Sequence, residues 1–273
     1  MCIRDRKYTL KDTLLHLEAI DIAYGDNLVI KDFTMTEKDV VIDGQNTGQF
    51  IAILGRSGRG KSSLFKVMTG LLKPTSGEVM ISNGVGGAKL VKEGDVGFVN
   101  QKYTLFRHKT VYQILFYALR KTGKTKAQKE EMITTYLTNW DLLRQKDQYS
   151  CELSGGQRQR TAILEQIFTS GKYIVFDEPA SGLDVGNIEK LKKSFALISQ
   201  QDELNTVIFS THDINLAVEL ADSIYVIGHP SDDVTYSTKV AHYDLKEMGL
   251  AWRPFGEKHL ELVDEIKEIM LKS

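Results

Sequence analysis

The stretch GQFIAILGRSGRGKSS, residues 48–63, decides the fold. Residues 48–54 are apolar enough to form a buried strand, and the strand runs directly into a glycine-rich loop. The loop fits the spacing G-x-x-x-x-G-K-[ST] over residues 55–62, and residues 61–72 continue with the apolar spacing of a helix. A strand, a glycine loop and a helix in this order predict a phosphate-binding unit in an α/β protein.

The residue types of the loop suit phosphate chemistry. Glycines at 58 and 60 let backbone N–H groups approach phosphate oxygens, Lys61 supplies a positive charge, and the Ser62 hydroxyl can ligate magnesium. The alternative is a glycine-rich turn that carries a lysine by chance. We expect the two arginine side chains of the loop to be solvated. The predicted phosphate site consists of Gly55, Arg56, Ser57, Gly58, Arg59, Gly60, Lys61, Ser62 and Ser63.

The stretch YIVFDE, residues 173–178, supplies a second half of the site. Its apolar residues predict a buried parallel strand, and Asp177 and Glu178 follow at the carboxyl end, where open α/β sheets bind ligands. Asp177 can hold magnesium, and Glu178 can polarise an attacking water. An acidic pair alone is typical of a helix cap or a solvated turn, so this interpretation depends on the glycine loop.

Bulk composition excludes several classes of protein. The chain has 273 residues, with 35 Lys and Arg against 36 Asp and Glu, so it lacks the overall positive charge on which nonspecific nucleic-acid binding relies. No run of about 18 apolar residues predicts a membrane span, and two cysteines favour a reducing compartment. We interpret residues 1–6, MCIRDR, as a disordered tail or a non-native scar. The scattered histidines predict no zinc site.

The stretch LSGGQRQR, residues 153–160, begins a predicted helix with a serine and two glycines. Glycine weakens a helix but opens its first turn to an anion, which predicts a second phosphate cradle. Together with GRSGRGKSS, GFVNQ, YIVFDE, SGLD and STHD, in this order, it gives a chain that resembles the ATP-binding cassette (ABC) ATPase family from about residue 14 to 228.

The resemblance implies a fold and its subdivision. The expected fold is an α/β P-loop nucleoside triphosphatase with a RecA-like, mostly parallel sheet, an antiparallel β subdomain and a helical signature subdomain. The whole chain, 1–273, is then one ABC ATPase domain, with the helical subdomain over about 103–160 and a C-terminal extension over about 230–273.

The resemblance also implies roles for residues. ATP and Mg²⁺ are the expected ligands. The residues expected to act in catalysis are Glu178, His212, Lys61 and Gln101, and those expected to bind magnesium are Ser62, Gln101 and Asp177. Tyr24 is expected to stack on adenine. The residues expected to contact nucleotide across a head-to-tail dimer are Ser154, Gly155, Gly156, Gln157 and Asp184. Because the first cradle already grips the phosphates from one side, the second is expected to cap the γ-phosphate bound by another copy.

The expected partners are a second ABC ATPase subunit, in a homodimer, a transmembrane permease and a substrate-binding protein, with no nucleic acid. The chain would then lie at the cytoplasmic face of the membrane as a peripheral subunit. Segments TEKDVVIDGQNTGQ and YDLKEMGLAW, together with the SGLD and DELNT stretches, resemble ATPase subunits of the nitrate, sulfonate and bicarbonate importer group. The alternative is a soluble ABC-type ATPase that acts on nucleic acid or ribosomes, although residues 62–153 are too few for the long coiled coils of its chromosomal members.

Residues 102–120, KYTLFRHKTVYQILFYALR, carry more large apolar side chains than one helix face buries. We expect Leu105 and Phe106 to be exposed and to contact the membrane subunit. Tyr112, Leu115 and Phe116, at helical spacing, are expected to belong to the core. The closing segment 257–273 predicts an amphipathic helix that buries Leu260, Val263, Ile266 and Met270.

Overall fold

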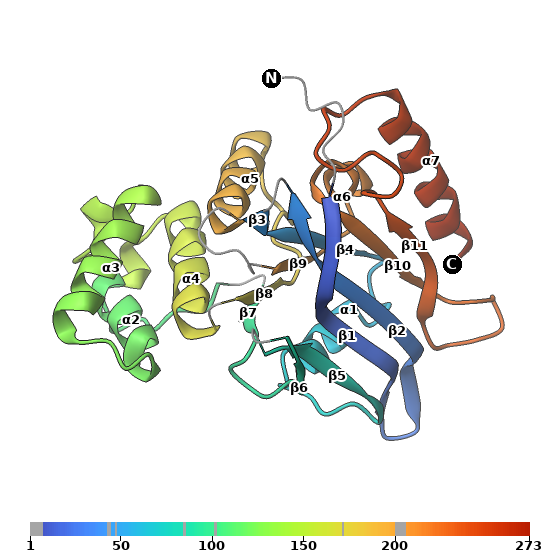
Figure 1. The fold of residues 1–273 in the computed structure, drawn as a ribbon, viewed down its shortest axis with the longest axis horizontal. Helices are drawn as coiled ribbons and strands as arrows, with labels where there is room; N and C mark the ends of the chain where they lie inside the picture. Colours follow the sequence, from blue (N-terminus) through green and yellow to red (C-terminus); the bar gives the residue numbers. More distant parts are fainter. Residues whose placement is uncertain are drawn as a thin grey trace.

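The computed structural model describes residues 8–42, 45–46, 48–83, 86–100, 103–170, 172–199 and 206–273. Two β-sheets lie at its centre, a group of helices extends to one side, and the C-terminal helix lies at the other side (Figure 1). Residues 1–6, interpreted above as a tail or scar, lie outside the described ranges, and so does Gln101.

The larger sheet has the strand order β11-β10-β4-β9-β8-β7 within the described residues. All neighbouring pairs from β10 to β7 are parallel, and β11 pairs antiparallel with β10. The strands are β4 (Gln49–Leu54), β7 (Gly97–Val99), β8 (Tyr173–Phe176), β9 (Thr206–Thr211), β10 (Ser223–Gly228) and β11 (Thr238–Asp244). This mixed, largely parallel sheet confirms the predicted α/β class.

Alternation along β4 shows how the sheet divides the interior. Ile51 and Ile53 point to one core, which contains the antiparallel sheet and α1, whereas Ala52 and Leu54 point to the other, which contains the remaining helices. All four side chains are fully buried. Since both faces of a parallel sheet are covered, its strands consist of continuous apolar runs, which is why they are readable in the sequence.

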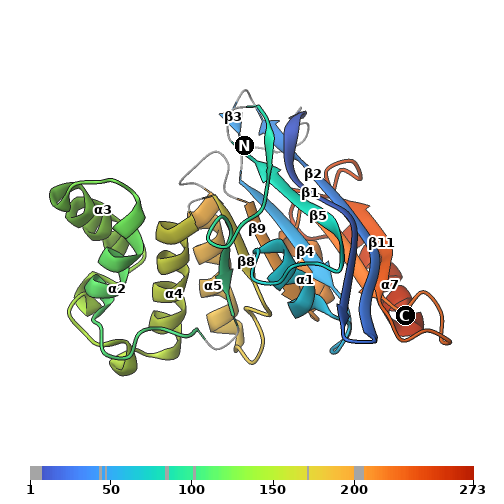
Figure 2. The ribbon, with the colours of Figure 1, turned by 90° about the horizontal axis from the view of Figure 1, so that it is seen from below.

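The smaller sheet is antiparallel, with the order β3-β2-β1-β5-β6. Figure 2 shows its long strands beside α1 and the parallel sheet. Its members are β1 (Tyr8–Tyr24), β2 (Asn27–Ile42), β3 (Gln45–Asn46), β5 (Ser76–Ser82) and β6 (Ala88–Leu90), and α1 spans Lys61–Met68.

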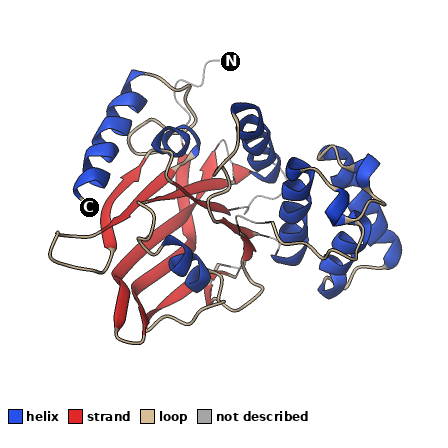
Figure 3. Ribbon diagram, turned by 180° about the vertical axis from the view of Figure 1, so that it is seen from behind, coloured by secondary structure: helices blue, strands red, loops and turns tan. Residues whose placement is uncertain are grey.

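The helices separate into groups in Figure 3. One group projects away from the sheets and contains α2 (Val111–Ala118), α3 (Lys126–Asn139) and the long helix α4 (Gly155–Ser170). The others are α5 (Val185–Ser199), α6 (Ile214–Leu220) and α7 (Glu257–Lys272). None of the described helices combines the length and the apolar character needed to cross a bilayer.

Three sequence expectations need correction. The stretch LVIKDFTM, residues 28–35, predicts a strand that ends near residue 35. In the structure β2 continues to Ile42, because its later residues remain paired with the equally long β1. Helix α1 stops at Met68 and leaves Leu71 half exposed, since Gly70 adopts a positive φ of 70°. In α7, Leu262 is buried and Leu260 is 52% exposed, because the helix turns Leu260 away from its buried stripe.

A cluster of buried charges lies where β4 and β10 begin. Lys246 Nζ is 3.3 Å from Asp244, 4.0 Å from Glu37 and donates a hydrogen bond to the carbonyl of Asp222. The Asp222 carboxyl accepts the Phe50 N–H at 2.8 Å. Burial raises the pKa of Asp222 to about 7 and also raises the pKa of Glu37, with Lys246 opposing both shifts.

We predict that Asp222→Asn removes part of the pH dependence of stability. Asparagine still offers an oxygen to the Phe50 N–H but carries no charge. Because the folded pKa of Asp222 lies above its unfolded value, its favourable contribution is complete below the unfolded pKa and is lost as pH rises through about 7. Between pH 5.5 and 8, the wild-type melting temperature should fall relative to that of the variant by roughly 3–6 °C. A constant difference in calorimetry would contradict this assignment.

Candidate nucleotide site

The shared edge of the parallel strands brings distant segments together. The glycine loop follows β4, the acidic pair Asp177 and Glu178 follows β8, and His212 follows β9. Parallel strands in register end at the same edge, so these side chains meet although more than 100 residues separate the first two.

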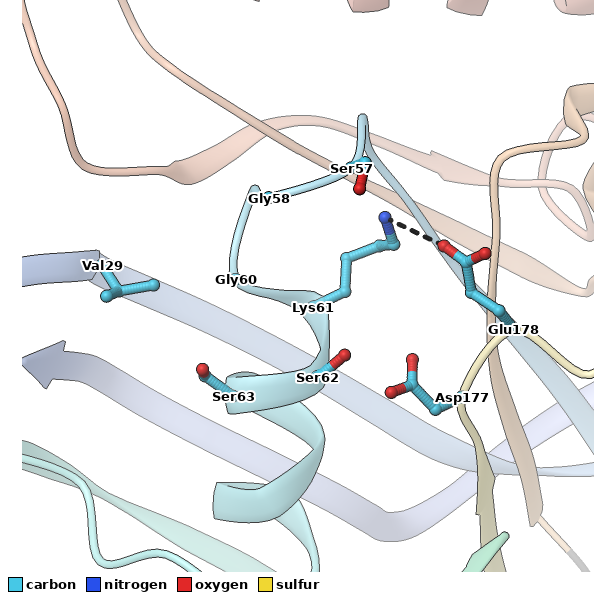
Figure 4. Close-up of a pocket in the computed structure, with 9 residues that line it drawn as sticks. All are labelled: Val29, Ser57, Gly58, Gly60, Lys61, Ser62, Ser63, Asp177 and Glu178. Carbon is cyan, nitrogen blue, oxygen red and sulfur yellow. Dashed lines mark ion pairs between the residues drawn. The ribbon is translucent and has the colours of Figure 1, made fainter. Parts of the chain in front are cut away.

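A cavity of about 520 Å³ lies at this edge. Figure 4 shows the loop curving around it, with Lys61 on one side and Glu178 on the other. Its lining consists of Val29, Ser57, Gly58, Gly60, Lys61, Ser62, Ser63, Asp177 and Glu178. The structure thus brings most of the predicted phosphate loop and both acidic residues to one cavity, and it adds Val29 from β2.

The loop conformation requires glycine at three points. Gly58 and Gly60 have φ of 82° and 86°, which side chains disfavour. A Cβ on Gly60 would also lie 2.8 Å from Val29, and one on Gly55 would lie 2.7 Å from the carbonyl oxygen of Ile227 at the end of β10. Nothing lies within 4 Å of a Cβ position on Gly58, so the backbone there is accessible to a ligand.

The Lys61 ammonium is buried and held at the centre of this loop. Its Nζ donates hydrogen bonds to the carbonyls of Gly55 at 2.7 Å and Arg56 at 3.1 Å, and it lies 3.5 Å from the Glu178 carboxylate. Only 5% of the residue is exposed. The ammonium thus has three oxygen partners, one of them a carboxylate. A phosphate oxygen, which is also a negatively charged acceptor, can replace the Glu178 carboxylate.

The acidic pair is fixed by Ser210 on β9. The Ser210 hydroxyl donates to Asp177 Oδ1 at 2.9 Å and accepts the Glu178 N–H at 2.9 Å. Glu178 has a φ of 48°, a strained conformation for a non-glycine residue, and its Oε2 lies 3.2 Å from His212 Nδ1. One signal in the sequence points to Ser210: it is a polar residue that directly follows the apolar run 207–209 of β9.

The sequence predicts a solvated Arg59, but in the structure its side chain contacts His229. Its Nη1 lies 2.6 Å from Nε2 and 3.0 Å from Nδ1 of His229, the residue after β10, because both segments end at the same sheet edge. Burial and the neighbouring guanidinium lower the pKa of His229. The uncharged ring can therefore accept the arginine N–H. Arg56 is exposed, as expected.

Tyr24 ends β1 beside the cavity. It is 48% exposed, and its hydroxyl lies 3.1 Å from the hydroxyl of Ser63. This contact ties the tyrosine to the first turn of α1. An exposed ring next to a phosphate site is positioned to stack on a base.

The residues expected to contact a second copy, in the LSGGQ stretch and at Asp184, lie outside this cavity. The Ser154 hydroxyl accepts the Gln157 N–H, and the Gln157 side chain accepts the Ser154 N–H, which closes a capping box at the start of α4. Gly155 and Gly156 have open space at their Cβ positions. Asp184 is exposed and caps α5 by accepting from Asn187. None of these described residues lines the cavity.

Comparison with known proteins places the chain. The family model described as ABC transporter matches residues 44–181. The chain belongs to the ABC transporter family. Among curated ABC relatives, it is 34% identical over 219 residues to the sulfate/thiosulfate import ATP-binding protein CysA 2 of Shewanella oneidensis, covering 78% of this chain and 59% of that protein. It is also 34% identical over 215 residues to the probable ABC transporter ATP-binding protein PEB1C of Campylobacter jejuni, covering 77% and 85%.

Solved ABC structures share the fold. The structure of cbiO1 from Clostridium perfringens, part of the ABC transporter complex cbiONQ, is 25% identical with a TM-score of 0.70, covering 88% of this chain and 92% of that chain. A nucleotide-free ATP-binding cassette from an ABC transporter also gives a TM-score of 0.70 at 22% identity. The chain spans about six-tenths of the length of the first curated ABC relatives that it matches.

Two substitutions separate the roles of Lys61 and Glu178. We predict that Lys61→Ala weakens ATP binding and stops turnover, because the loop loses its only positive group in the cavity lining described here. Glu178→Gln should retain bound ATP while hydrolysis falls ~10²–10⁴-fold, because the amide cannot accept a proton from water. Equilibrium binding and single-turnover assays measure the two effects. Hydrolysis by Glu178→Gln at the wild-type rate would show that another group is the base.

Proposed function

We propose that this chain is the ATP-binding and ATP-hydrolysing subunit of an ABC importer. The observation that carries the proposal is the buried Lys61 ammonium, which lies between loop carbonyls and the Glu178 carboxylate in the same cavity as Ser62 and Asp177. This arrangement offers a phosphate-binding cation, an acceptor for a water proton and oxygen ligands for a cation within one cavity.

On ATP binding, Lys61 exchanges the Glu178 carboxylate for a phosphate oxygen. The exchange frees Glu178 to accept a proton from the attacking water, while His212, 3.2 Å away, fixes the direction of the carboxylate. Phosphoryl transfer needs mainly positioning and charge stabilisation, so these few side chains and the loop N–H groups suffice. Tyr24 stacks on the adenine from the end of β1.

The residues near Asp177 also fit magnesium. Figure 4 shows the Ser62 side chain pointing toward Asp177, and a hydroxyl beside a carboxylate is a hard oxygen pair of the kind Mg²⁺ prefers. One Asp177 oxygen accepts from Ser210, which orients the other toward the cavity. We infer that Ser62 and Asp177 hold Mg²⁺, which when bound neutralises charge on the phosphates. Gln101, the third predicted ligand, lies outside the described residues.

The second cradle supports a head-to-tail homodimer. Ser154 and Gly155 are exposed at the start of α4, and Gly156 is open to an approaching ligand, yet they do not line the cavity that contains Lys61. An anion on these N–H groups therefore comes from a second copy, whose signature residues cap the γ-phosphate in return. Gln157 holds the cradle through the capping box, and Asp184 lies at the proposed interface.

Complementation tests the head-to-tail arrangement. In a mixture of Lys61→Ala and Ser154→Arg subunits, the heterodimer should have one site with both lesions and one intact site. ATPase activity of the mixture should then exceed that of either variant alone. If the two sites were each formed within one chain, both would carry a lesion and the mixture would stay inactive. Melting curves of both variants must first match the wild type, because Ser154→Arg also removes a helix cap.

Relatives support the role in import. CysA 2 and the Fe(3+) ions import ATP-binding protein FbpC 1 of Pectobacterium atrosepticum, 29% identical over 216 residues with 79% of this chain and 59% of that protein covered, are named as import proteins. We therefore place the chain at the cytoplasmic face of a membrane, attached to a permease that receives substrate from a binding protein. The nitrate, sulfonate and bicarbonate group remains a prediction for its substrate. The soluble alternative finds no support among these names.

A cavity beside α2 suits the permease. It is lined by His108, Lys109, Tyr112, Gln113, Phe116, Tyr117, Arg120 and Lys129. Phe106 lies against this region, 41% exposed, with its ring 5.8 Å from that of Tyr117. Leu105, also expected to be exposed, is half-buried. Leu115 belongs to the core as expected, whereas Tyr112 and Phe116 are only partly buried, pack against the core and line this cavity. The exposed aromatic rings favour a short helix from the membrane subunit as their partner.

Phe106→Asp should leave the isolated protein folded and able to bind ATP, while it weakens association with the membrane subunit at least tenfold. A charge among aromatic rings opposes burial of the partner but costs little in an exposed position. Thermal melting with MgATP and pull-down of the membrane protein that copurifies with the wild type measure both effects. Leu271→Asp, at a 71% exposed leucine on α7, is the matched control. Normal partner binding by Phe106→Asp would exclude this surface.

A further inference from the structure

Tyr103 joins three segments that surround the site. It precedes α2, and its hydroxyl donates to the carbonyl of Pro179 at 3.1 Å and accepts a hydrogen bond from Gln159 Nε2 at 2.8 Å. Gln159 Nε2 also lies 3.4 Å from the Pro179 carbonyl, so the three groups form a closed triangle. The segment before α2, helix α4 and the turn after β8 are therefore fixed to one another at a single point.

The triangle is built to keep one hydrogen-bonding state. Gln159 is 5% exposed, and burial raises the pKa of Tyr103 to about 12. The phenol therefore stays protonated at neutral pH and keeps its donor for Pro179. Tyr103 has a φ of 43°, which is strained for a tyrosine. Tyr103 is half-buried, and its hydroxyl both donates and accepts a hydrogen bond, so this strained residue is held by more than packing of its ring.

Two members of the triangle, Pro179 and Gln159, lie close in sequence to residues that take part in the proposed nucleotide chemistry. Pro179 directly follows Glu178, which is itself strained at a φ of 48°. Gln159 lies about one helical turn after Gly155 on α4, whose first N–H groups form the signature cradle. A rigid helix moves as a unit, so a displacement of its first turn reaches Gln159 and, through Tyr103, the turn that carries Glu178.

We propose that Tyr103 is a positioning residue that sets the place of Glu178 according to the position of helix α4. Contact between the signature cradle and the nucleotide of a second copy would thereby adjust the base that serves this chain's own nucleotide. The inference rests on the proposed function, because it assigns hydrolysis to Glu178 and a second nucleotide to α4.

Tyr103→Phe removes only the hydroxyl and keeps the ring. Its control is Tyr173→Phe. Tyr173 is buried, its pKa is likewise raised to about 12, and its hydroxyl donates to the carbonyl of Leu14 at 3.1 Å from the opposite end of β8. Both variants lose a tyrosine-to-carbonyl hydrogen bond, and Tyr103→Phe also loses the acceptor of the Gln159 amide. Only the first changes the surroundings of Glu178.

In steady-state assays with MgATP, Tyr103→Phe should lower kcat about tenfold or more while KM stays within threefold, because the phosphate loop is untouched. Tyr173→Phe should keep wild-type kcat at a similar loss of melting temperature. Gln159→Met should reproduce the kcat defect, and the double variant should be no slower than the slower single variant, because the residues act as one unit.

Equal kcat for Tyr103→Phe and Tyr173→Phe would overturn the inference and leave the proposed function intact. Additive losses in the double variant would also overturn it. A wild-type protein that hydrolyses no ATP would refute the proposed function itself, and the inference with it. If Tyr103→Phe fails to fold, Gln159→Met against Tyr173→Phe applies the same criterion.

Discussion

The buried Lys61 ammonium is the group on which the site depends. Two loop carbonyls and the Glu178 carboxylate surround it, so the positive charge is neutralised and its direction is fixed. Breaking a buried charge pair without replacement is costly, but a phosphate supplies a replacement of the same sign. In the proposed function, the carboxylate holds the place of a phosphate oxygen, and the arrival of phosphate releases the group that we propose as the base.

This arrangement follows from the parallel pairing of β4, β9 and β8. Because the three strands end at the same edge of the sheet, the segments that follow them bring the glycine loop, His212 and the acidic pair together there. The residues at the opposite edge of the sheet have a structural role. There Lys246, in the C-terminal segment, donates a hydrogen bond to the carbonyl of Asp222, which directly precedes β10. The sheet thus separates a chemical edge from a structural one.

Much of this could be predicted from sequence, because local patterns determine it. Apolar runs gave the parallel strands, and the loop spacing placed Lys61 and Ser62 correctly beside Asp177 and Glu178. What escaped prediction depends on contacts between distant segments. Arg59 contacts His229, 170 residues away, and Ser210 links the acidic pair from another strand, and no local pattern names either partner. The extent of β2 and the exposure of Leu260 likewise depend on the neighbouring strand and on the packed helix face.

The central claim is that each chain contributes one half to each of two nucleotide sites: the phosphate loop to one site and the signature cradle to the other. Sedimentation velocity of the Glu178→Gln protein, with MgATP, with MgADP and without nucleotide, tests it most directly. The account predicts a shift from monomer to dimer with MgATP alone, because only the γ-phosphate reaches the signature cradle of a second copy. A protein that is saturated with ATP and still sediments as a monomer would contradict the account.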